Sequence, residues 1–451
     1  MPVIDTVPTA PKALPLLGHS LPLLRDPQKF LGSLAPVGDL VRIRVGPIGM
    51  VVVCDADLTQ RVLRDDRTFD KGGVLFDRVR EVLGNGPGSC PYQGHRRLRR
   101  LLQPAFHGAR LPAYAEVMSD HVEEVVDSWR DGQVVDVPGE IMRATNRILM
   151  TAVFSDTLPD ETLEQMIGDV GVVFEGFYRQ MFMPEWLTRL PVPGNRSFLK
   201  AKERLTTTTH EIIARRRASG ADHGDLLSAL VSARDAESAN ERLSDDEISD
   251  AVISFLFAGG ESSATVVAWA LHALGQNPEA QRLLHEEVDQ VLAGRTATYD
   301  DVPRLEYTDR VVKETLRLYS PGWFLTRKST ADATLGEHRI PAGTTIAYSP
   351  YIVHRSAEHF TRPAAFDPGR WDASDGRRLP PRQAMVPFGS GARKCIGDKF
   401  ATVEAVITLA TIVARWKPEP VPNVKVRAAI GSVMTPRRLP MRLAARKVAA
   451  R

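Results

Sequence analysis

The sequence predicts one mainly helical domain with small β-sheets, an α+β fold that extends over residues 1–451. Apolar residues recur at helical spacing through most of residues 95–318, whereas strict alternation of apolar and polar residues is confined to short stretches such as 41–45. No internal repeat, low-complexity tract or linker divides the chain. We therefore expect a β-rich part at about residues 1–70 and a helix-rich remainder.

The composition excludes several classes of protein. A hydrophobic content of 43% and a charged content of 25% are ordinary for a globular domain, and 451 residues suffice to enclose a cofactor. The net charge of +3 does not indicate a nucleic-acid partner. Cys54, Cys90 and Cys395 are widely spaced and form no CxxC pair, so neither a disulfide framework nor a zinc site is expected.

A cytoplasmic location fits these features, because unpaired cysteines suit a reducing compartment. Residues 1–20 lack the basic start and apolar run of a signal peptide. The most apolar stretch, 251–275, contains Glu261 beside two glycines, and a charged residue at the centre of a membrane span is rare. We expect a buried core helix there and no membrane anchor.

The elements follow in order from local patterns. Residues 41–45 and 50–53 read as two strands joined by a turn, and residues 323–350 as further short strands. The density of glycine and proline in residues 72–94 predicts a loop region.

A long central helix is the strongest single prediction. Ser244 and Glu247 have the spacing of a capping box, and the helical pattern continues to about Leu274. Such a helix is about 45 Å long and has to cross the middle of the protein. Shorter helices are expected at 278–292 and 311–318, and a last one after Gly397.

A glycine-rich loop delivers Cys395 to the start of that last helix. A helix N-terminus favours the thiolate, which is the metal-binding form of cysteine, and Arg393 adds positive charge nearby. Alternatively, Cys395 is a small buried hydrophobic residue and the glycines only form a turn.

The spacing F-x-x-G-x-R-x-C-x-G, carried by Phe388, Gly391, Arg393, Cys395 and Gly397, resembles the haem-binding signature of the cytochrome P450 family. The resemblance implies the cytochrome P450 fold, with haem b buried between the central helix and the cysteine loop. It implies Cys395 as the axial ligand of the iron, where a thiolate favours O–O cleavage. It also implies that Phe388 packs beside the loop and that Arg393 pairs with a haem propionate.

Glu314 and Arg317 share one face of a helix, a spacing that also occurs in ordinary exposed ion pairs of small energetic effect. The family has an E-x-x-R helix that pairs with a downstream arginine, and Arg370 stands at the matching place. The resemblance therefore implies a buried structural network of Glu314, Arg317 and Arg370.

His95 and Arg99 lie four residues apart within a basic run. The run is either a solvated or phosphate-binding surface, or the equivalent of the family's H-x-x-x-R helix, which binds haem propionates. Arg327 matches another propionate-binding position of the family. On that resemblance, His95, Arg99, Arg327 and Arg393 surround the propionates.

The segment Ala258-Gly259-Gly260-Glu261-Ser262 resembles the family's A-G-x-[DE]-T motif, with serine in place of threonine. Two glycines inside a helix cost about 1 kcal/mol each, so they serve either close helix packing or a groove over the haem for O₂. Glu261 is expected to relay protons and Ser262 to orient water and oxygen. Ser262 can instead bond the carbonyl of Ala258.

The resemblance also implies an apolar substrate site, with a lid in the glycine-rich loop. Residues 172–178 and 190–196 are similar to those of bacterial oxidases of cyclic sesquiterpenes, although each pocket residue could equally be plain core. The residues expected at this site are Phe76, Ser254, Phe257, Ala258, Trp323, Leu325 and Val433.

Electrons are expected from NAD(P)H through a separate ferredoxin and ferredoxin reductase, and the protein is expected to be a monomer. A basic patch would steer an acidic ferredoxin, unless its members pair with propionates or form a solvated face. The patch residues are Arg96, Arg97, Arg100, Lys394 and Lys399.

Other functions stay open. Within the same family, the alternatives are a fatty-acid or macrolide hydroxylase and a redox-independent rearrangement catalyst. Peroxide-driven fatty-acid hydroxylases carry an arginine–proline pair where this chain has Glu261 and Ser262, which argues against that group. A haem protein that binds a ligand without catalysis is the alternative from another class.

Overall fold

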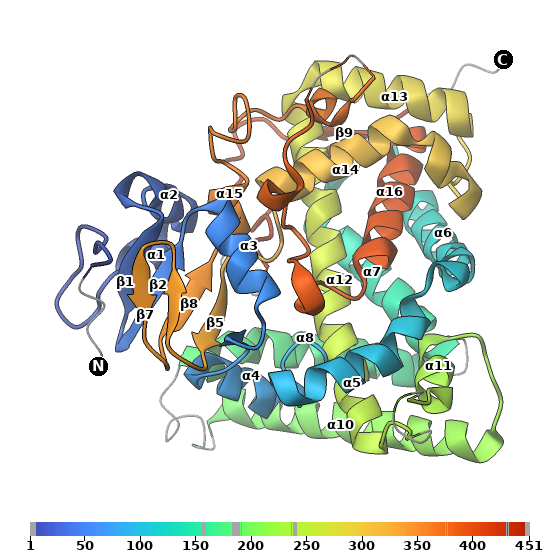
Figure 1. Cartoon of the computed structure of the whole chain (residues 1–451). Helices are drawn as coiled ribbons and strands as arrows, with labels where there is room; N and C mark the ends of the chain where they lie inside the picture. Colours follow the sequence, from blue (N-terminus) through green and yellow to red (C-terminus); the bar gives the residue numbers. More distant parts are fainter. Residues whose placement is uncertain are drawn as a thin grey trace.

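The computed structural model describes residues 6–155, 158–182, 190, 192–235, 237, 241–374, 376, 378–429, 431 and 433–446. Its helices surround one long helix, α12 (Asp245–Gln276), which passes through the middle of the molecule (Figure 1). The largest sheet lies at the left of the view, on the side of the N-terminus. The predicted mainly helical α+β fold is confirmed.

The helices up to the end of α11 form the N-terminal and lower parts of Figure 1. They are α1 (Ser20–Arg25), α2 (Pro27–Gly32), α3 (Ala56–Arg64), α4 (Val74–Leu83), α5 (Tyr92–Leu102), α6 (Leu111–Ser128), α7 (Val137–Phe154), α8 (Asp160–Phe182), α10 (Pro193–Ser219) and α11 (Leu226–Ser232).

The later helices pack around the other end of α12. They are α13 (Pro278–Leu292), α14 (Glu306–Leu318), α15 (Pro350–Val353) and α16 (Asp398–Arg415). Short 3₁₀ helices connect them: η1 (Ala35–Val37), η2 (Gln103–Phe106), η3 (Gly108–Arg110), η5 (Tyr299–Arg304), η6 (Pro368–Trp371), η7 (Arg382–Ala384) and η8 (Gly391–Arg393).

The largest sheet joins strands from residues 40–70 with strands from residues 325–348. Its strand order is β1-β2-β8-β5-β3, with β2 and β8 parallel and the other neighbours antiparallel. The β-rich N-terminal part is therefore completed by strands from the predicted 323–350 region. The strands are β1 (Leu40–Val45), β2 (Ile48–Val53), β3 (Phe69–Asp70), β5 (Leu325–Ser329) and β8 (Thr345–Tyr348).

Two smaller sheets complete the fold. One has the order β4-β10-β9, and the other pairs β6 with β7. Their strands are β4 (Val134–Asp136), β6 (Ala333–Leu335), β7 (His338–Ile340), β9 (Trp416–Pro420) and β10 (Pro440–Ala445).

The start of α12 has the predicted capping box. The Ser244 hydroxyl accepts from the Glu247 backbone N–H at 3.1 Å, and the Ser244 N–H donates to the Glu247 carboxylate at 2.9 Å. In length and apolar composition α12 could cross a membrane, but 72% of its most apolar window is buried inside the protein. It is the core helix that the sequence predicts.

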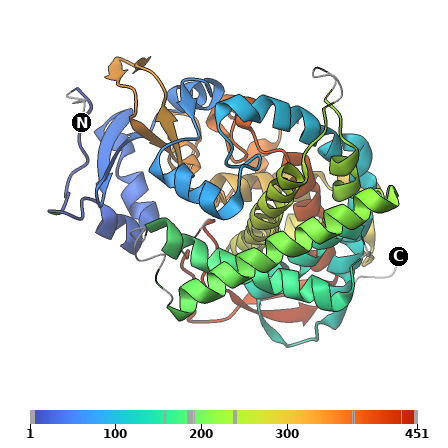
Figure 2. The same cartoon turned by 90° about the horizontal axis from the view of Figure 1, so that it is seen from below.

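Helices α8 and α10 lie across the N-terminal end of α12, as seen from below in Figure 2. Helix α7 packs along the middle of α12, and α14 and α16 pack further along it. This arrangement places the segment 258–262 at the centre of the molecule.

The prediction of a loop at residues 72–94 is wrong in two places. Helix α4 occupies residues 74–83, and α5 begins at Tyr92. The glycines flank α4 rather than interrupt it: Gly73 has φ +82° at its start and Gly84 has φ +68° at its end. The turns at these glycines were predicted correctly, but the helix of ten residues between them was not predicted.

Candidate functional site

The loop before α16 presents Cys395 in a conformation that needs glycine. Gly389 and Gly391 have φ values of +71° and +69°. A Cβ on Gly391 would lie 2.6 Å from the carbonyl oxygen of Leu63, because α3 packs directly on the loop. The Cys395 N–H closes the loop by donating to the Phe388 carbonyl at 2.9 Å.

The Cys395 side chain is accessible, yet it lies deep enough that burial is the largest influence on its pKa, which is raised. The Gly397 backbone N–H, Arg99 and Lys71 act in the opposite sense and favour the thiolate, while Asp398 disfavours it. A coordinated metal ion deprotonates such a thiol.

Arg393, whose positive charge was predicted to favour the thiolate, has two carboxylate partners. Its guanidinium bonds Asp70 at 2.7 Å and Asp66 at 3.3 Å, and donates to the Cys90 carbonyl at 2.6 Å. These two carboxylates neutralise it. Arg99 instead donates to the Lys394 carbonyl at 2.6 Å, so it supports the cysteine loop directly.

Several cations converge beside the loop. Burial and the charges of Arg327 and Arg393 lower the pKa of Lys71 to about 7. Burial, together with Arg393, Lys71, Arg99 and Arg327, lowers the pKa of His95 to about 3. Clustered cations of this kind need anions that the protein supplies only in part, through Asp66 and Asp70.

Two groups beside the loop are left unpaired among the described residues: the imidazole of His95, which its low pKa keeps neutral at pH 7, and the guanidinium of Arg327. The Nδ1 atom of His95 is buried without a hydrogen-bond partner. Arg327 is buried and stacks over Tyr348, and its guanidinium donates to the Thr326 carbonyl at 2.8 Å. A thiol ligand beside buried, under-compensated cations fits a porphyrin that carries two propionates.

Lys71 was missed by sequence reasoning. It stands between Asp70 and two glycines, directly before the segment 72–94 that was predicted as a loop, and no motif marks it. Its ammonium donates to the Gly88 carbonyl at 2.7 Å. Only the folded chain brings it to Arg327 and Cys395.

Glu314, Arg317 and Arg370 form a buried network. Glu314 and Arg317 are fully buried, with N–O distances of 2.7 and 2.9 Å, and Arg370 lies 3.4 Å from the Glu314 carboxylate. Trp371 donates to the same carboxylate at 3.0 Å. The alternative of an ordinary exposed pair is therefore wrong.

His354 links this network to the cysteine loop, a connection absent from the sequence prediction. Its Nε2 accepts from the Val386 N–H at 2.9 Å, so its Nδ1 carries the proton that faces the Arg317 carbonyl at 3.1 Å. Val386 lies just before Phe388. The network thus contacts the chain that leads into the loop.

At the centre of α12, Ala258 is exposed although most of the helix is buried. The Ser262 hydroxyl donates to the Ala258 carbonyl at 2.7 Å and lies 3.1 Å from that of Gly259, the bond expected of a serine within a helix. Glu261 is partly buried.

Gly259 and Gly260 serve helix packing. A Cβ on Gly259 would lie 2.8 Å from Leu149, and one on Gly260 would collide with Asn146, both on α7. Thr145 of the same helix donates to the Gly260 carbonyl at 2.9 Å. The alternative of a groove opened by these two glycines is wrong, because their bare faces point at α7.

The expected substrate residues fall into two groups. On α12, Phe257 stacks on Phe174 of α8 at 4.9 Å and lies 5.8 Å from Phe177. Ser254 is buried against Gly86, and its hydroxyl has no partner among the described residues. Phe76 lies on α4, where its ring centroid is 6.0 Å from the Lys71 ammonium.

The second group lies beside the large sheet. Trp323 is buried in the N-terminal core and donates to the Gly431 carbonyl at 3.0 Å. Leu325 is on β5, and Val433 precedes Met434, whose N–H donates to Pro321. Of the two terpene-oxidase-like stretches, the side chain of Tyr178 and Pro191 lie outside the described residues.

The predicted basic patch is smaller than expected. Arg97 pairs with Glu241 and Glu247, at 3.1 and 2.6 Å. Arg100 pairs with Asp235 and Glu237, both at 3.0 Å, and Lys394 pairs with Asp398. Within the described part of the chain, exposed cations near the loop that form no ion pair include Arg96, Lys399, Arg61 and Arg64.

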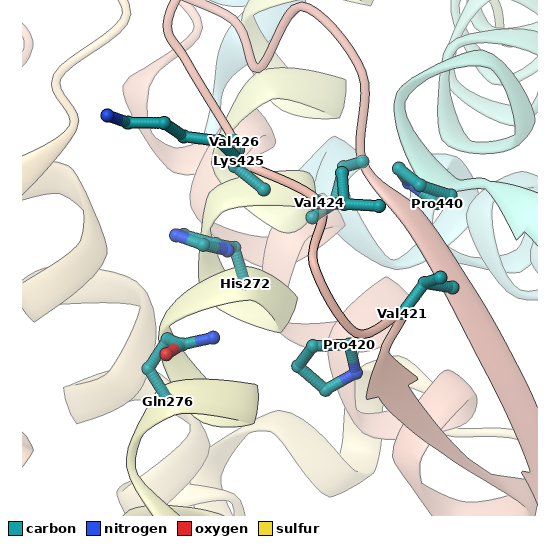
Figure 3. A pocket seen from close by; sticks show the side chains of 9 residues that line it. His272, Gln276, Pro420, Val421, Val424, Lys425, Val426 and Pro440 are labelled. Atoms are coloured by element: carbon teal, nitrogen blue, oxygen red, sulfur yellow. The ribbon is translucent and has the colours of Figure 1, made fainter.

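Two hollows lie elsewhere. One of about 280 Å³ lies at the C-terminal end of α12, between His272 and Gln276 on the helix and Pro420, Lys425 and Pro440 (Figure 3). The other, of about 430 Å³, lies where α10 ends near α11. Neither is lined by a predicted site residue.

Residues 8–441 match the family model described as Cytochrome P450. The chain belongs to the cytochrome P450 family. This P450 is therefore a haem-iron enzyme of the monooxygenase class, and the family, fold and enzyme class predicted from the sequence are confirmed.

Its relatives cover nearly all of the chain. Pentalenene oxygenase of Streptomyces avermitilis is 41% identical over 97% of both chains. Cyclooctatin synthase of Streptomyces melanosporofaciens is 42% identical over 93% of this chain and 91% of its own. The cyclooctat-9-en-7-ol 5-monooxygenase of the same organism is 41% identical over the same shares.

The fold is shared with solved structures. The haem domain of cytochrome P450DA has a TM-score of 0.88 at 24% identity, and covers 98% of both chains. A triple mutant of that domain has a TM-score of 0.89 at 26% identity.

Proposed function

We propose that this P450 inserts one oxygen atom from O₂ into a cyclic terpene in bacterial secondary metabolism. The observation that carries the proposal is the relationship, at 41–42% identity over more than nine-tenths of each chain, to enzymes named for pentalenene and cyclooctatin. The stacked Phe257, Phe174 and Phe177 supply apolar, aromatic surface beside the exposed Ala258. Such a lining suits a hydrocarbon skeleton.

The residues assigned to the haem follow from the site. Cys395 would bind the haem iron, and His95, Lys71, Arg327 and Arg99 would hold the propionates, with Arg393 exchanging Asp66 for a propionate. Bound haem supplies the activation of O₂, to which a thiolate ligand contributes electron density. Phe388, Gly391 and Gly397 shape the loop, while Glu314, Arg317 and Arg370 brace it.

Glu261 and Ser262 are proposed to deliver protons. The Ser262 hydroxyl donates its hydrogen bond to the Ala258 carbonyl. To orient a water molecule, it has to break that bond and bond to the water instead. Glu261 is the neighbouring acid and brings protons toward it. Phe76, Ser254, Trp323, Leu325 and Val433 are proposed to border the substrate together with Phe257 and Ala258.

Electrons are proposed to come from NAD(P)H through a ferredoxin and its reductase, to a monomer in the cytoplasm. The docking patch is redefined as Arg61, Arg64, Arg96 and Lys399, because Arg97 and Arg100 are neutralised. Arg64→Glu with Arg96→Glu should slow reduction by an acidic ferredoxin severalfold at low salt and flatten its salt dependence. Arg339→Glu, on β7, is the matched control. If it slowed reduction by ferredoxin as much as the double variant, ferredoxin would dock at another surface.

The haem assignment is tested first by the visible spectrum of the reduced protein under carbon monoxide. A far-red-shifted Soret band that disappears in Cys395→Ser is expected. A band typical of histidine-ligated haem, unchanged by the substitution, would contradict the assignment.

The substrate class is tested by titration with cyclic terpenes, fatty acids and macrolides, followed by product analysis. Cyclic terpenes should shift the spin state, increase NADPH consumption with redox partners, and yield a product that is heavier by one oxygen. A response to fatty acids or macrolides alone would contradict the proposed substrate. NADPH consumption that no compound increases would favour a non-catalytic haem protein.

A further inference from the structure

The hollow of about 430 Å³ where α10 ends near α11 is lined by arginines from three segments of the chain. Its volume lies within the range of small-molecule sites, which is about 300–1,000 Å³. A concentration of guanidinium groups in such a space favours an anionic ligand. The four arginines are Arg216, Arg217, Arg234 and Arg242.

The two arginines on α10 are already neutralised. Arg216 is 5% exposed and donates to the carboxylate of Asp225 at 2.7 and 2.8 Å. Arg217 lies 2.6 Å from the carboxylate of Asp245, the first residue of α12. These ion pairs fix one wall of the hollow, and they leave no surplus charge on it.

The other two arginines face each other. An isolated antiparallel bridge pairs Arg234 with Arg242, and both side chains are exposed. Residues directly opposite in such a bridge lie on the same face, with Cβ atoms about 5 Å apart, and like charges in this arrangement are destabilising. Neither arginine forms an ion pair within the described part of the chain, so their charges repel each other uncompensated.

The acidic neighbours of these arginines point to the opposite face of the bridge, because successive side chains of an extended chain alternate. Asp235 pairs with Arg100 of α5 at 3.0 Å, and Glu241 pairs with Arg97 of the same helix at 3.1 Å. The chain thus uses its own carboxylates on the α5 side and presents two unpaired guanidinium groups to the hollow.

Two further polar side chains line the hollow. The hydroxyl of Ser228, a residue 5% exposed, accepts from Arg216 and from the His223 N–H at 3.0 Å, so its own proton is left for another acceptor. The carboxylate of Asp222 accepts from the Gly224 N–H at 2.9 Å. Among the described lining residues, one carboxylate therefore stands against two unpaired arginines.

We propose that this hollow binds a small phosphorylated molecule, with the phosphate group between Arg234 and Arg242. A phosphate monoester has a charge between about −1.5 and −2 at pH 7 and three acceptor oxygens. The guanidinium fork matches those oxygens in pairs, and the Ser228 hydroxyl is a third donor. The inference is independent of the proposed oxygenation, because no haem-binding residue takes part in it.

The charge of the ligand separates phosphate from other anions. A carboxylate has a single negative charge, so it would leave one of the two facing arginines uncompensated. A phospholipid head group has the same chemistry as a soluble phosphate ester. The enclosed volume of the hollow favours the soluble molecule, and the experiment distinguishes the two sources.

The first test is calorimetric titration of the haem-loaded protein with inorganic diphosphate at pH 7 and constant ionic strength. Arg234→Gln with Arg242→Gln should weaken binding about tenfold or more, because charge-assisted hydrogen bonds are lost. The matched control is Arg196→Gln with Arg215→Gln, which removes two charges from exposed positions of α10 outside the hollow. Its affinity should stay within twofold of the wild type.

Four results would overturn the proposal. Equal weakening in both double variants would mean that only the net charge attracts diphosphate. A wild type that binds no diphosphate at millimolar concentrations, or that binds acetate as tightly, would contradict a phosphate site. Binding to vesicles that contain phosphatidic acid, without binding to soluble diphosphate, would assign the arginines to a lipid surface. None of these measurements requires turnover, so a failure of the proposed function would not affect them.

The second test is thermal unfolding with and without diphosphate. Without an anion, Arg234→Gln relieves the repulsion across the bridge, so its Tm should equal or exceed that of the wild type. Saturating diphosphate should raise the Tm of the wild type and leave that of the double variant nearly unchanged. A clear loss of Tm in Arg234→Gln without any anion would show that this arginine stabilises the fold by itself, and would contradict the proposal.

Discussion

The two sides of α12 hold their residues by different means. On the ligand-side core, formed by α14, α16 and residues 386–395, Arg317 alone makes five hydrogen bonds while fully buried. On the distal lid, formed by α4 and its contacts with α10 and α12, single bonds join remote segments. Asp250 accepts from the Asn85 N–H at 2.7 Å, and Lys202 donates to the Glu81 carbonyl.

Glycines allow the lid to approach α12 closely. A Cβ on Gly84 or Gly86 would collide with Asp250 or Ser254. The lid therefore contacts α12 through small residues and a few exposed hydrogen bonds, which water can replace. The hydrogen bonds of the ligand-side core are buried, so water cannot replace them. This difference suits the tasks proposed for them, because a lid would have to open for substrate while the ligand loop would have to stay fixed.

The largest expected effect is on the ligand-side core. Glu314→Gln would leave Arg317 and Arg370 buried without their counter-charge, so it should cost about 3–5 kcal/mol in the free energy of unfolding. Urea denaturation and the haem content of the purified protein measure it. Glu286→Gln, which breaks an exposed pair with Arg282 on α13, is the control and should cost less than about 1 kcal/mol. Similar losses in both variants would contradict the contrast between the two sides.

A smaller, pH-dependent effect is expected at His354. Burial lowers the pKa of His354 to about 3 from an ordinary 6.5. Between these pH values the unfolded state therefore binds a proton that the folded state does not bind. The stability that depends on neutral His354 is thus complete above pH 6.5 and is lost as the pH falls from there toward 3. His354→Gln should be less stable at pH 7, yet lose less on acidification. Unfolding curves at several pH values measure this, and equal acid slopes would mean that His354 is not held neutral.

The smallest effect on stability is expected in the distal lid. Asp250→Ala removes one hydrogen bond to Asn85 and should cost about 0.5–1.5 kcal/mol. Because that bond holds the end of α4, substrate should dissociate severalfold faster, as stopped-flow spin-state measurements would detect. Asp250→Asn keeps an acceptor and should retain most of the wild-type rate. Equal dissociation rates in all three proteins would show that α4 does not retain the substrate.

The sequence by itself determined the features that depend on near neighbours in the chain. The capping box at Ser244 was predicted from spacing alone, and the structure contains it. The cysteine loop and the Glu314–Arg317 pair also lie within a few residues each, but their roles were predicted from the resemblance of these motifs to the family. The sequence analysis also gave a bond from Ser262, which replaces the family's threonine, to the Ala258 carbonyl as one alternative, and the structure contains this bond. Helix α4 was missed because its flanking glycines dominated the local pattern.

Only the tertiary structure decided which remote groups meet. It turned Gly259 and Gly260 toward α7, neutralised Arg97 and Arg100 with distant carboxylates, and gave Arg393 two aspartate partners. It also brought Lys71 to the cation cluster and His354 to the cysteine loop. The physical reason is that burial and charge compensation depend on the packing of whole helices, which local periodicity does not specify.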